Sequence, residues 1–130
     1  MHSLKFEYTR IGKNYFPMID VELISPKNSV ITKAYVDSGA TYSLFKSELA
    51  ELIDIDYKKG KKLYPVGIGG HICAYLNKLK MKVGNIEFKC EIMFSDELIV
   101  RFNIIGRKGF FENFKVCYDE TNNIIELFKK

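Results

Sequence analysis

The amino-acid sequence predicts an all-β fold, and three observations support this class. The 130 residues are 47% hydrophobic, which is enough for one buried core and gives no reason for a second domain, so residues 1–130 are expected to form a single domain. The aromatic residues are 10 Phe and 8 Tyr with no Trp, and together with many Ile and Val they favour strands. Short segments of alternating apolar and polar residues are separated by turn residues, as in half-buried strands.

The first part of the chain is predicted to form a hairpin that ends at Asp37. Residues 16–23 alternate between apolar and polar side chains, residues 25–28 (Ser-Pro-Lys-Asn) form a turn, and residues 30–36 return as a second strand. Asp37 therefore begins a loop that leaves a strand.

A short amphipathic helix is predicted near residues 47–53. Ser43 and Ser47 are candidate N-caps, and four apolar residues fall on one helical face: Leu44, Leu49, Leu52 and Ile53. Two strands then follow at 63–66 and 71–75, and the glycine-rich residues 67–70 join them as the tip of a hairpin.

The second half of the chain continues the predicted sheet. Strands are expected at residues 79–83 and 86–94 around a Gly-Asn turn, and at 99–105 before Gly106. A short helix is predicted at 108–114. Residues 116–118 and 124–128 then form a terminal hairpin.

Charge and cysteine content exclude several function classes. The net charge of +4 is mild. The densest basic run, residues 58–62, is typical of a solvated loop, so no nucleic-acid partner is expected. Cys73, Cys90 and Cys117 lack the spacing of a zinc site or a disulfide framework, and no metal or cofactor is predicted. A long apolar run is missing, so neither a secretory signal nor a membrane partner is expected, and a cytoplasmic location follows.

The chemistry is expected at Asp37, Ser38 and Gly39. Taken alone, this tripeptide reads as an ordinary turn after a strand. The apolar residues 34–36 precede it, however, and the small residues 39–41 follow it, so a second backbone can approach the carboxylate closely.

Three separated segments together resemble the retropepsin-like aspartic protease family. Residues 35–41 (Tyr-Val-Asp-Ser-Gly-Ala-Thr) are similar to its active-site motif, residues 67–70 (Gly-Ile-Gly-Gly) to its flap tip, and residues 103–107 (Asn-Ile-Ile-Gly-Arg) to the motif that supports the active-site loop. Their order and spacing also fit, over nearly the whole domain. The resemblance implies a closed acid-protease barrel with a flap hairpin and one or two short helices.

The resemblance also implies an aspartic endopeptidase that acts as a homodimer on a peptide or protein substrate. The chain has one Asp-Ser-Gly, so Asp37 of each subunit would supply one of the two carboxylates that activate water. Ser38 matches the position that bonds across the dimer axis, Gly39 leaves room for substrate, and Gly106 supports the loop. Ala40 offers the carboxylate no hydroxyl hydrogen bond, which favours activity nearer neutral pH.

By the same resemblance the flap is formed by Gly67, Ile68, Gly69 and Gly70. The residues expected to line apolar subsites, or else to be plain barrel core, are Tyr35, Leu44, Ile68, Phe102 and Ile104. Thr41 departs from the retroviral pattern, in which an acid pairs with the arginine matched by Arg107. The terminal hairpin is expected either to supply the dimer interface or to close the barrel.

Other readings of the same residues are weaker. His71 with Ser38 or Ser43 could form a base and nucleophile, His71 with His2 could bind a metal, and Cys73 could be a nucleophile, but no further group supports any of them. A second hypothesis is a non-catalytic barrel that binds a peptide or nucleic acid. In that case aromatic side chains would form a stacking surface: Phe88, Phe94 and Phe102.

Overall fold

The computed structural model describes residues 3–67, 70–98 and 102–130. The predicted first hairpin is present as β4 (Met18–Ile24) and β5 (Ser29–Val36), which pair in antiparallel register from Met18 opposite Tyr35 to Ile24 opposite Ser29. Ser25 closes the turn, since its amide and hydroxyl both bond the Asn28 carbonyl. The hairpin delivers Asp37 directly after the last residue of β5.

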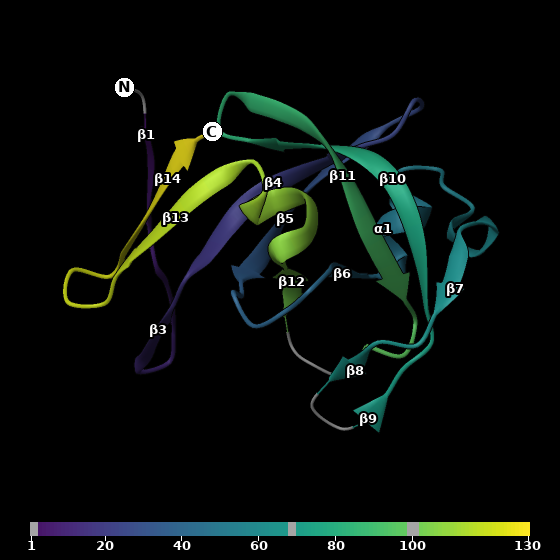
Figure 1. The fold of residues 1–130 in the computed structure, drawn as a ribbon, viewed down its shortest axis with the longest axis horizontal. Coiled ribbons are helices and arrows are strands. Elements are labelled where there is room, and N and C mark those ends of the chain that lie inside the picture. The colour runs from purple at the N-terminus through teal and green to yellow at the C-terminus, as the bar shows by residue number, and fades with distance from the viewer. Residues whose placement is uncertain (1–2, 68–69, 99–101) are drawn as a thin grey trace.

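Six strands close into a barrel, which confirms the predicted fold class (Figure 1). The sheet order is β11-β6-β12-β5-β4-β10-β7, and β11 pairs again with β10 to complete the ring. Two of these pairings are parallel, β5 with β12 and β6 with β11. The bounds are β6 (Ser43–Lys46), β7 (Lys61–Leu63), β10 (Ala74–Val83), β11 (Ile86–Ser95) and β12 (Asn103–Ile105).

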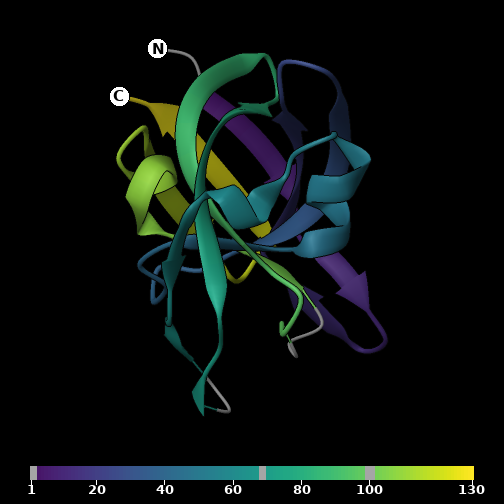
Figure 2. The ribbon, with the colours of Figure 1, turned by 90° about the vertical axis from the view of Figure 1, so that its right-hand side faces the viewer.

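A second sheet covers one side of the barrel core. Its order is β1-β14-β13, with β1 (Ser3–Glu7), β13 (Phe114–Asp119) and β14 (Ile124–Lys129). Ile125 and Leu127 of β14 are fully buried in the core. The terminal hairpin therefore closes the core, and the pairing of β1 with β14 brings both chain ends together (Figures 1 and 2).

The N-terminal strands were not predicted from the sequence. Leu4 and Phe6 alternate with charged residues in β1, a period-two signal that would have identified this strand. β2 (Thr9–Ile11) and β3 (Asn14–Phe16) form a small hairpin whose turn contains Gly12 at φ 62°. Each of these two strands has only three residues, too few for a periodic pattern.

The helices differ in part from the prediction. α1 (Ser47–Leu52) confirms the expected helix, but neither candidate serine caps it. Ser43 lies in β6, Ser47 is the first helical residue, and Lys46 takes the N-cap position. Leu44 lies in β6 as well, and Leu52 is 59% exposed, so neither belongs to a buried helical face.

Two further helical turns are short. η1 is Tyr57–Lys59, and η2 (Arg107–Phe111) replaces the helix predicted at 108–114. Helical geometry is broken at Lys108 and Gly109 of η2, and Phe114 already begins β13. Of the strand predicted at 99–105, β12 spans Asn103–Ile105, and residues 99–101 lie outside the described residues. The helices of the described part of the chain are all too short to cross a membrane.

One buried polar side chain joins three strands of the barrel. The side-chain Nδ2 of Asn103 donates to the Thr32 hydroxyl (3.2 Å) and to the Lys33 backbone carbonyl (3.1 Å) of β5. Its side-chain Oδ1 accepts from the Lys46 backbone amide (3.0 Å) of β6. Asn103 is only 8% exposed. It therefore ties β12 to both neighbouring strands while its own polar atoms are satisfied.

Candidate active site

Asp37 lies at the tip of a loop that is anchored through its backbone. The Asp37 amide donates to the Ile105 carbonyl (2.9 Å), and the Ala40 amide donates back to the Asp37 carbonyl (3.2 Å). Asp37 Oδ1 accepts a hydrogen bond from the Gly39 amide (2.8 Å). Asp37 is half-buried, whereas Ser38 and Gly39 are exposed. A fixed carboxylate thus faces solvent at a place where a second molecule can approach.

Gly106 packs directly against the backbone of this loop. A Cβ at Gly106 would collide with the backbone of Tyr42 and Ala40. The next two amides, of Arg107 and Lys108, donate to the carbonyls of Ala40 and Thr41 at 2.8 Å each. Only glycine allows the two segments to approach this closely.

Thr41 and Arg107 remain in contact although the acid of the retroviral pattern is absent. The Arg107 Nη2 donates to the Thr41 hydroxyl at 3.4 Å. A long hydrogen bond from the charged guanidinium to a hydroxyl thus stands where the retroviral pattern has an ion pair, on the exposed side of the loop.

Three of the predicted subsite residues lie side by side on the sheet. Ile104 of β12 is paired with Tyr35 of β5 on one side and with Leu44 of β6 on the other. All three are half-buried, while the alternating residues Val36 and Ile105 are fully buried in the core. These three side chains therefore line one half-exposed face that begins next to Asp37.

An aromatic cluster adjoins this face. The ring of Phe102 stacks beside that of Tyr35, with centroids 6.2 Å apart. Phe16 of β3 completes the cluster at 5.5 Å from Phe102 and 6.3 Å from Tyr35. Phe102 was predicted as a subsite residue and Phe16 was not, because only the fold brings β3 to the end of β5.

Two tyrosines lie near Asp37, one from β13 and one from β5. The Tyr118 hydroxyl of β13 donates to the Val36 carbonyl at 2.9 Å. Burial, followed by the nearby Asp37 carboxylate, raises the pKa of Tyr118 to about 12 and also raises the pKa of Tyr35. From the sequence alone, Tyr118 was predicted only as a strand residue.

The hairpin at residues 66–71 is present as β8 (Val66–Gly67) and β9 (Gly70–His71), and it projects from the barrel (Figure 2). Ile68 and Gly69, predicted at its tip, lie outside the described residues. Its base is fixed, since the Cys73 amide donates to Glu97 Oε1 (3.0 Å) and the Cys73 carbonyl accepts from the Ser95 hydroxyl (2.6 Å). Val66 is 74% exposed, so the hairpin presents an uncovered apolar side chain.

The structure speaks against two of the alternative readings, and His2, which a third reading pairs with His71, lies outside the described residues. Ser43 is fully buried and its hydroxyl accepts from the Gly106 amide (3.1 Å), so it is not a nucleophile for the exposed His71. Phe88 and Phe94 are buried in the core and form no stacking surface. Among the described residues, His, Cys, Asp and Glu form no group that could hold a metal.

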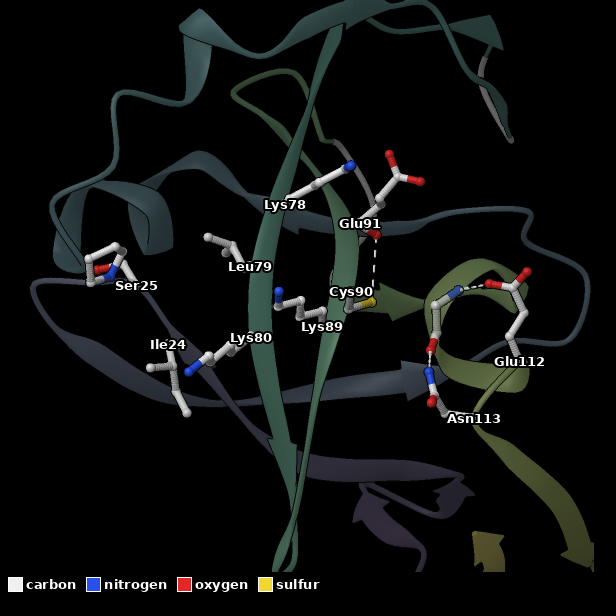
Figure 3. Close-up of a pocket in the computed structure, with 12 residues that line it drawn as sticks. Ile24, Ser25, Lys78, Leu79, Lys80, Lys89, Cys90, Glu91, Glu112 and Asn113 are labelled. Carbon is white, nitrogen blue, oxygen red and sulfur yellow. Dashed lines mark hydrogen bonds between the residues drawn. The ribbon is translucent and has the colours of Figure 1, made fainter. Parts of the chain in front are cut away.

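A cavity of about 680 Å³ is lined by residues other than those of the Asp37 loop, and Figure 3 shows this lining. Ser25, Leu79, Cys90 and Glu112 are among its lining residues. Burial raises the pKa of the Cys90 thiol to about 12, so this thiol stays protonated and unreactive near neutral pH.

The closed barrel with an Asp-Ser-Gly loop at the end of β5 is a retropepsin-like fold. A retropepsin-like aspartic protease from Rickettsia conorii superposes with a TM-score of 0.72 at 21% identity, over 98% of this chain and 99% of that chain. The EIAV protease complexed with the inhibitor HBY-793 superposes with a TM-score of 0.56 at 18% identity, over 76% of this chain and 88% of that one. No protein-family model and no curated protein sequence matches the chain.

Proposed function

We propose that this protein is an aspartic endopeptidase that acts as a homodimer. The observation that carries the proposal is the solvent-facing Asp37 carboxylate, which lies at the tip of a loop anchored to Ile105 by its own amide, within a retropepsin-like fold. The sequence contains one Asp-Ser-Gly, so a pair of carboxylates requires a second copy. The two Asp37 side chains would meet across a two-fold axis with a water molecule between them.

The reaction follows from the chemistry of such a pair. Two close carboxylates share one proton, so one Asp37 takes a proton from the water while the other donates to the substrate carbonyl oxygen. Attack of the water gives a tetrahedral diol, and its collapse with protonation of the amine breaks the peptide bond. Ser38 would bond across the axis. Gly39 would leave room for substrate, and it also keeps the carboxylate uncrowded, because a Cβ there would lie 3.2 Å from Asp37 Oδ1.

The substrate in this proposal is an extended peptide with bulky apolar side chains. The half-buried face of Tyr35, Leu44 and Ile104 offers apolar contacts next to Asp37. The hairpin of β8 and β9 would act as a flap, with Gly67, Ile68, Gly69 and Gly70 at its tip, and would close over the peptide as an added strand. Phe102 would border the same subsite through its stacking on Tyr35.

The location proposed for the enzyme is the cytoplasm. Cys73, Cys90 and Cys117 are all free thiols, as expected for a reducing compartment. Fractionation of cells that express the protein tests this part.

The test compares the wild-type chain with Asp37→Asn on a library of apolar peptides. Asp37→Asn should abolish hydrolysis, because an amide neither accepts the water proton nor shares one, while far-UV circular dichroism and melting temperature stay unchanged. Asp54→Asn is the matched control: Asp54 is exposed with φ 59°, a conformation that Asn adopts readily, and full activity should remain.

The stoichiometry provides a second, independent measurement. A transition-state-mimic inhibitor should saturate at one molecule per two chains, and sedimentation equilibrium should show a dimer at that point. If the wild-type chain cleaves no peptide, and Asp37→Asn binds peptide as tightly as wild type does, the non-catalytic peptide-binding barrel replaces the enzyme.

A further inference from the structure

The peptide group that joins Val36 to Asp37 is held at both of its polar ends. Its N–H, from Asp37, donates to the Ile105 carbonyl of β12 at 2.9 Å. Its C=O, from Val36, accepts from the Tyr118 hydroxyl of β13 at 2.9 Å. Because a peptide group is planar, fixing both ends fixes the direction in which the chain enters Asp37.

The two partners come from different parts of the fold. Ile105 belongs to the barrel, whereas Tyr118 belongs to the terminal sheet that lies outside it, 82 residues along the chain from Val36. The preceding amide, of Val36, donates to the Pro17 carbonyl at 2.9 Å. The backbone at Asp37 is therefore clamped by three separate segments.

Tyr118 is suited to a permanent donor role. The residue as a whole is 36% exposed. Burial and then the Asp37 carboxylate raise the pKa of its hydroxyl from 10.0 to about 12, so the hydroxyl stays a donor into alkaline solution. The Asp37 charge also acts on this hydroxyl, which places the terminal sheet within electrostatic reach of the carboxylate.

We propose that Tyr118 is a positioning residue for Asp37: its hydroxyl fixes the carbonyl end of the 36–37 peptide group and so couples the terminal sheet to the Asp37 loop. Its effect on catalysis rests on the proposed peptidase function. Its effect on the loop itself does not.

The experiment compares wild type, Tyr118→Phe and Tyr15→Phe by hydrogen–deuterium exchange and by peptide hydrolysis. Tyr118→Phe keeps the ring and removes only the hydroxyl. Exchange of the Asp37 amide should become about three- to tenfold faster, since one net hydrogen bond is lost there, while amides in β10 and β11 keep their rates. For hydrolysis, kcat should fall about ten- to a hundredfold with KM within about twofold, because misplacement of the carboxylate affects the reacting geometry. Tyr15 is 48% exposed on β3, and Tyr15→Phe should match wild type in both measurements.

The exchange result decides the inference without substrate. An Asp37 amide that exchanges as in wild type, or a rise shared equally by β10 and β11, overturns the positioning role. A wild-type chain that cleaves no peptide instead refutes the proposed function, while the exchange comparison still reports on Tyr118. If wild type cleaves and Tyr118→Phe keeps full kcat, the inference fails and the peptidase stands.

Discussion

The Ser43 hydroxyl accepts a hydrogen bond from the Gly106 amide at 3.1 Å, although 63 residues separate them. Ser43 is fully buried in β6, and Gly106 supports the Asp37 loop. A residue whose sequence position suggests a helix cap thus supports the Asp37 loop from inside the barrel.

Substitution of Ser43 should therefore destabilise the fold. Ser43→Ala leaves the buried Gly106 amide without its acceptor, and we expect the free energy of unfolding to fall by about 1–3 kcal/mol. Urea denaturation measures this loss. Ser29→Ala at an exposed position of β5 is the control and should change stability by less than about 0.5 kcal/mol. Equal effects of the two substitutions would contradict the role of the Ser43 hydroxyl.

Gly106→Ala should be more damaging, because the added Cβ collides with the rigid backbone of Tyr42 and Ala40. We expect a loss of at least about 2 kcal/mol in the free energy of unfolding, together with loss of peptide hydrolysis, since the Asp37 loop must move. Gly12→Asn is the control. Gly12 has φ 62° with open space around its Cα, and Asn tolerates this conformation. A normal melting temperature for Gly106→Ala would show that the loop is not held tightly.

Asn103→Ala should also unfold the barrel more easily. The substitution removes three hydrogen bonds and leaves the Lys33 carbonyl and the Lys46 amide without this partner, so we expect a loss of about 2–4 kcal/mol. Thermal and urea denaturation provide the measurement. The exposed Asn85→Ala is the matched control, and a similar small change in both variants would refute the bridging role of Asn103.

Stability should fall in alkaline solution. Burial raises the pKa of Cys90 from 9.0 to about 12, and burial first, then nearby acidic charges, raise those of Tyr8 and Tyr118 from 10.0 to about 12. Above pH 9 the unfolded chain loses these protons before the folded chain does, so the free energy of unfolding decreases as pH rises from about 9 to about 12. Below pH 9 these groups contribute no pH dependence.

Urea titrations at pH 7, 9, 10 and 11 measure this decrease. In Cys90→Ala the decline between pH 9 and 10 should largely disappear. The decline above pH 10 should become smaller but persist, because Tyr8 and Tyr118 still titrate there. A wild-type stability that is constant up to pH 11 would rule out the expected dependence.

Ile104→Ala should weaken recognition of apolar substrates. Ile104 lies between Tyr35 and Leu44 on the half-buried face beside Asp37, so its truncation removes apolar contact at the centre of the proposed subsite. We expect kcat/KM for peptides with bulky apolar residues at the cleavage site to fall about tenfold or more. Ile31→Ala, at a residue of β5 that is 69% exposed, is the control. A parallel loss in both variants, or none in Ile104→Ala, would place the subsite elsewhere.

Local sequence patterns determined a large part of the architecture. The alternation of residues 16–23 predicted β4, and the turn at 25–28 with the returning strand 30–36 predicted β5, and hence the position of Asp37 at the end of a strand. The Gly-Asn turn at 84–85 predicted the long hairpin of β10 and β11. Such patterns are readable because strand periodicity and turn chemistry act over neighbouring residues.

Only the tertiary structure decided which distant residues serve the Asp37 loop. Three contacts join separate segments of the chain: Ser43 with Gly106, Phe16 with Tyr35, and Tyr118 with the Val36 carbonyl. No local pattern encodes them, because a buried hydroxyl or a neighbouring ring has a role only once the barrel has closed. The sequence by itself thus determined the strands and the candidate carboxylate, while closure of the barrel and docking of the terminal sheet determined how that carboxylate is held.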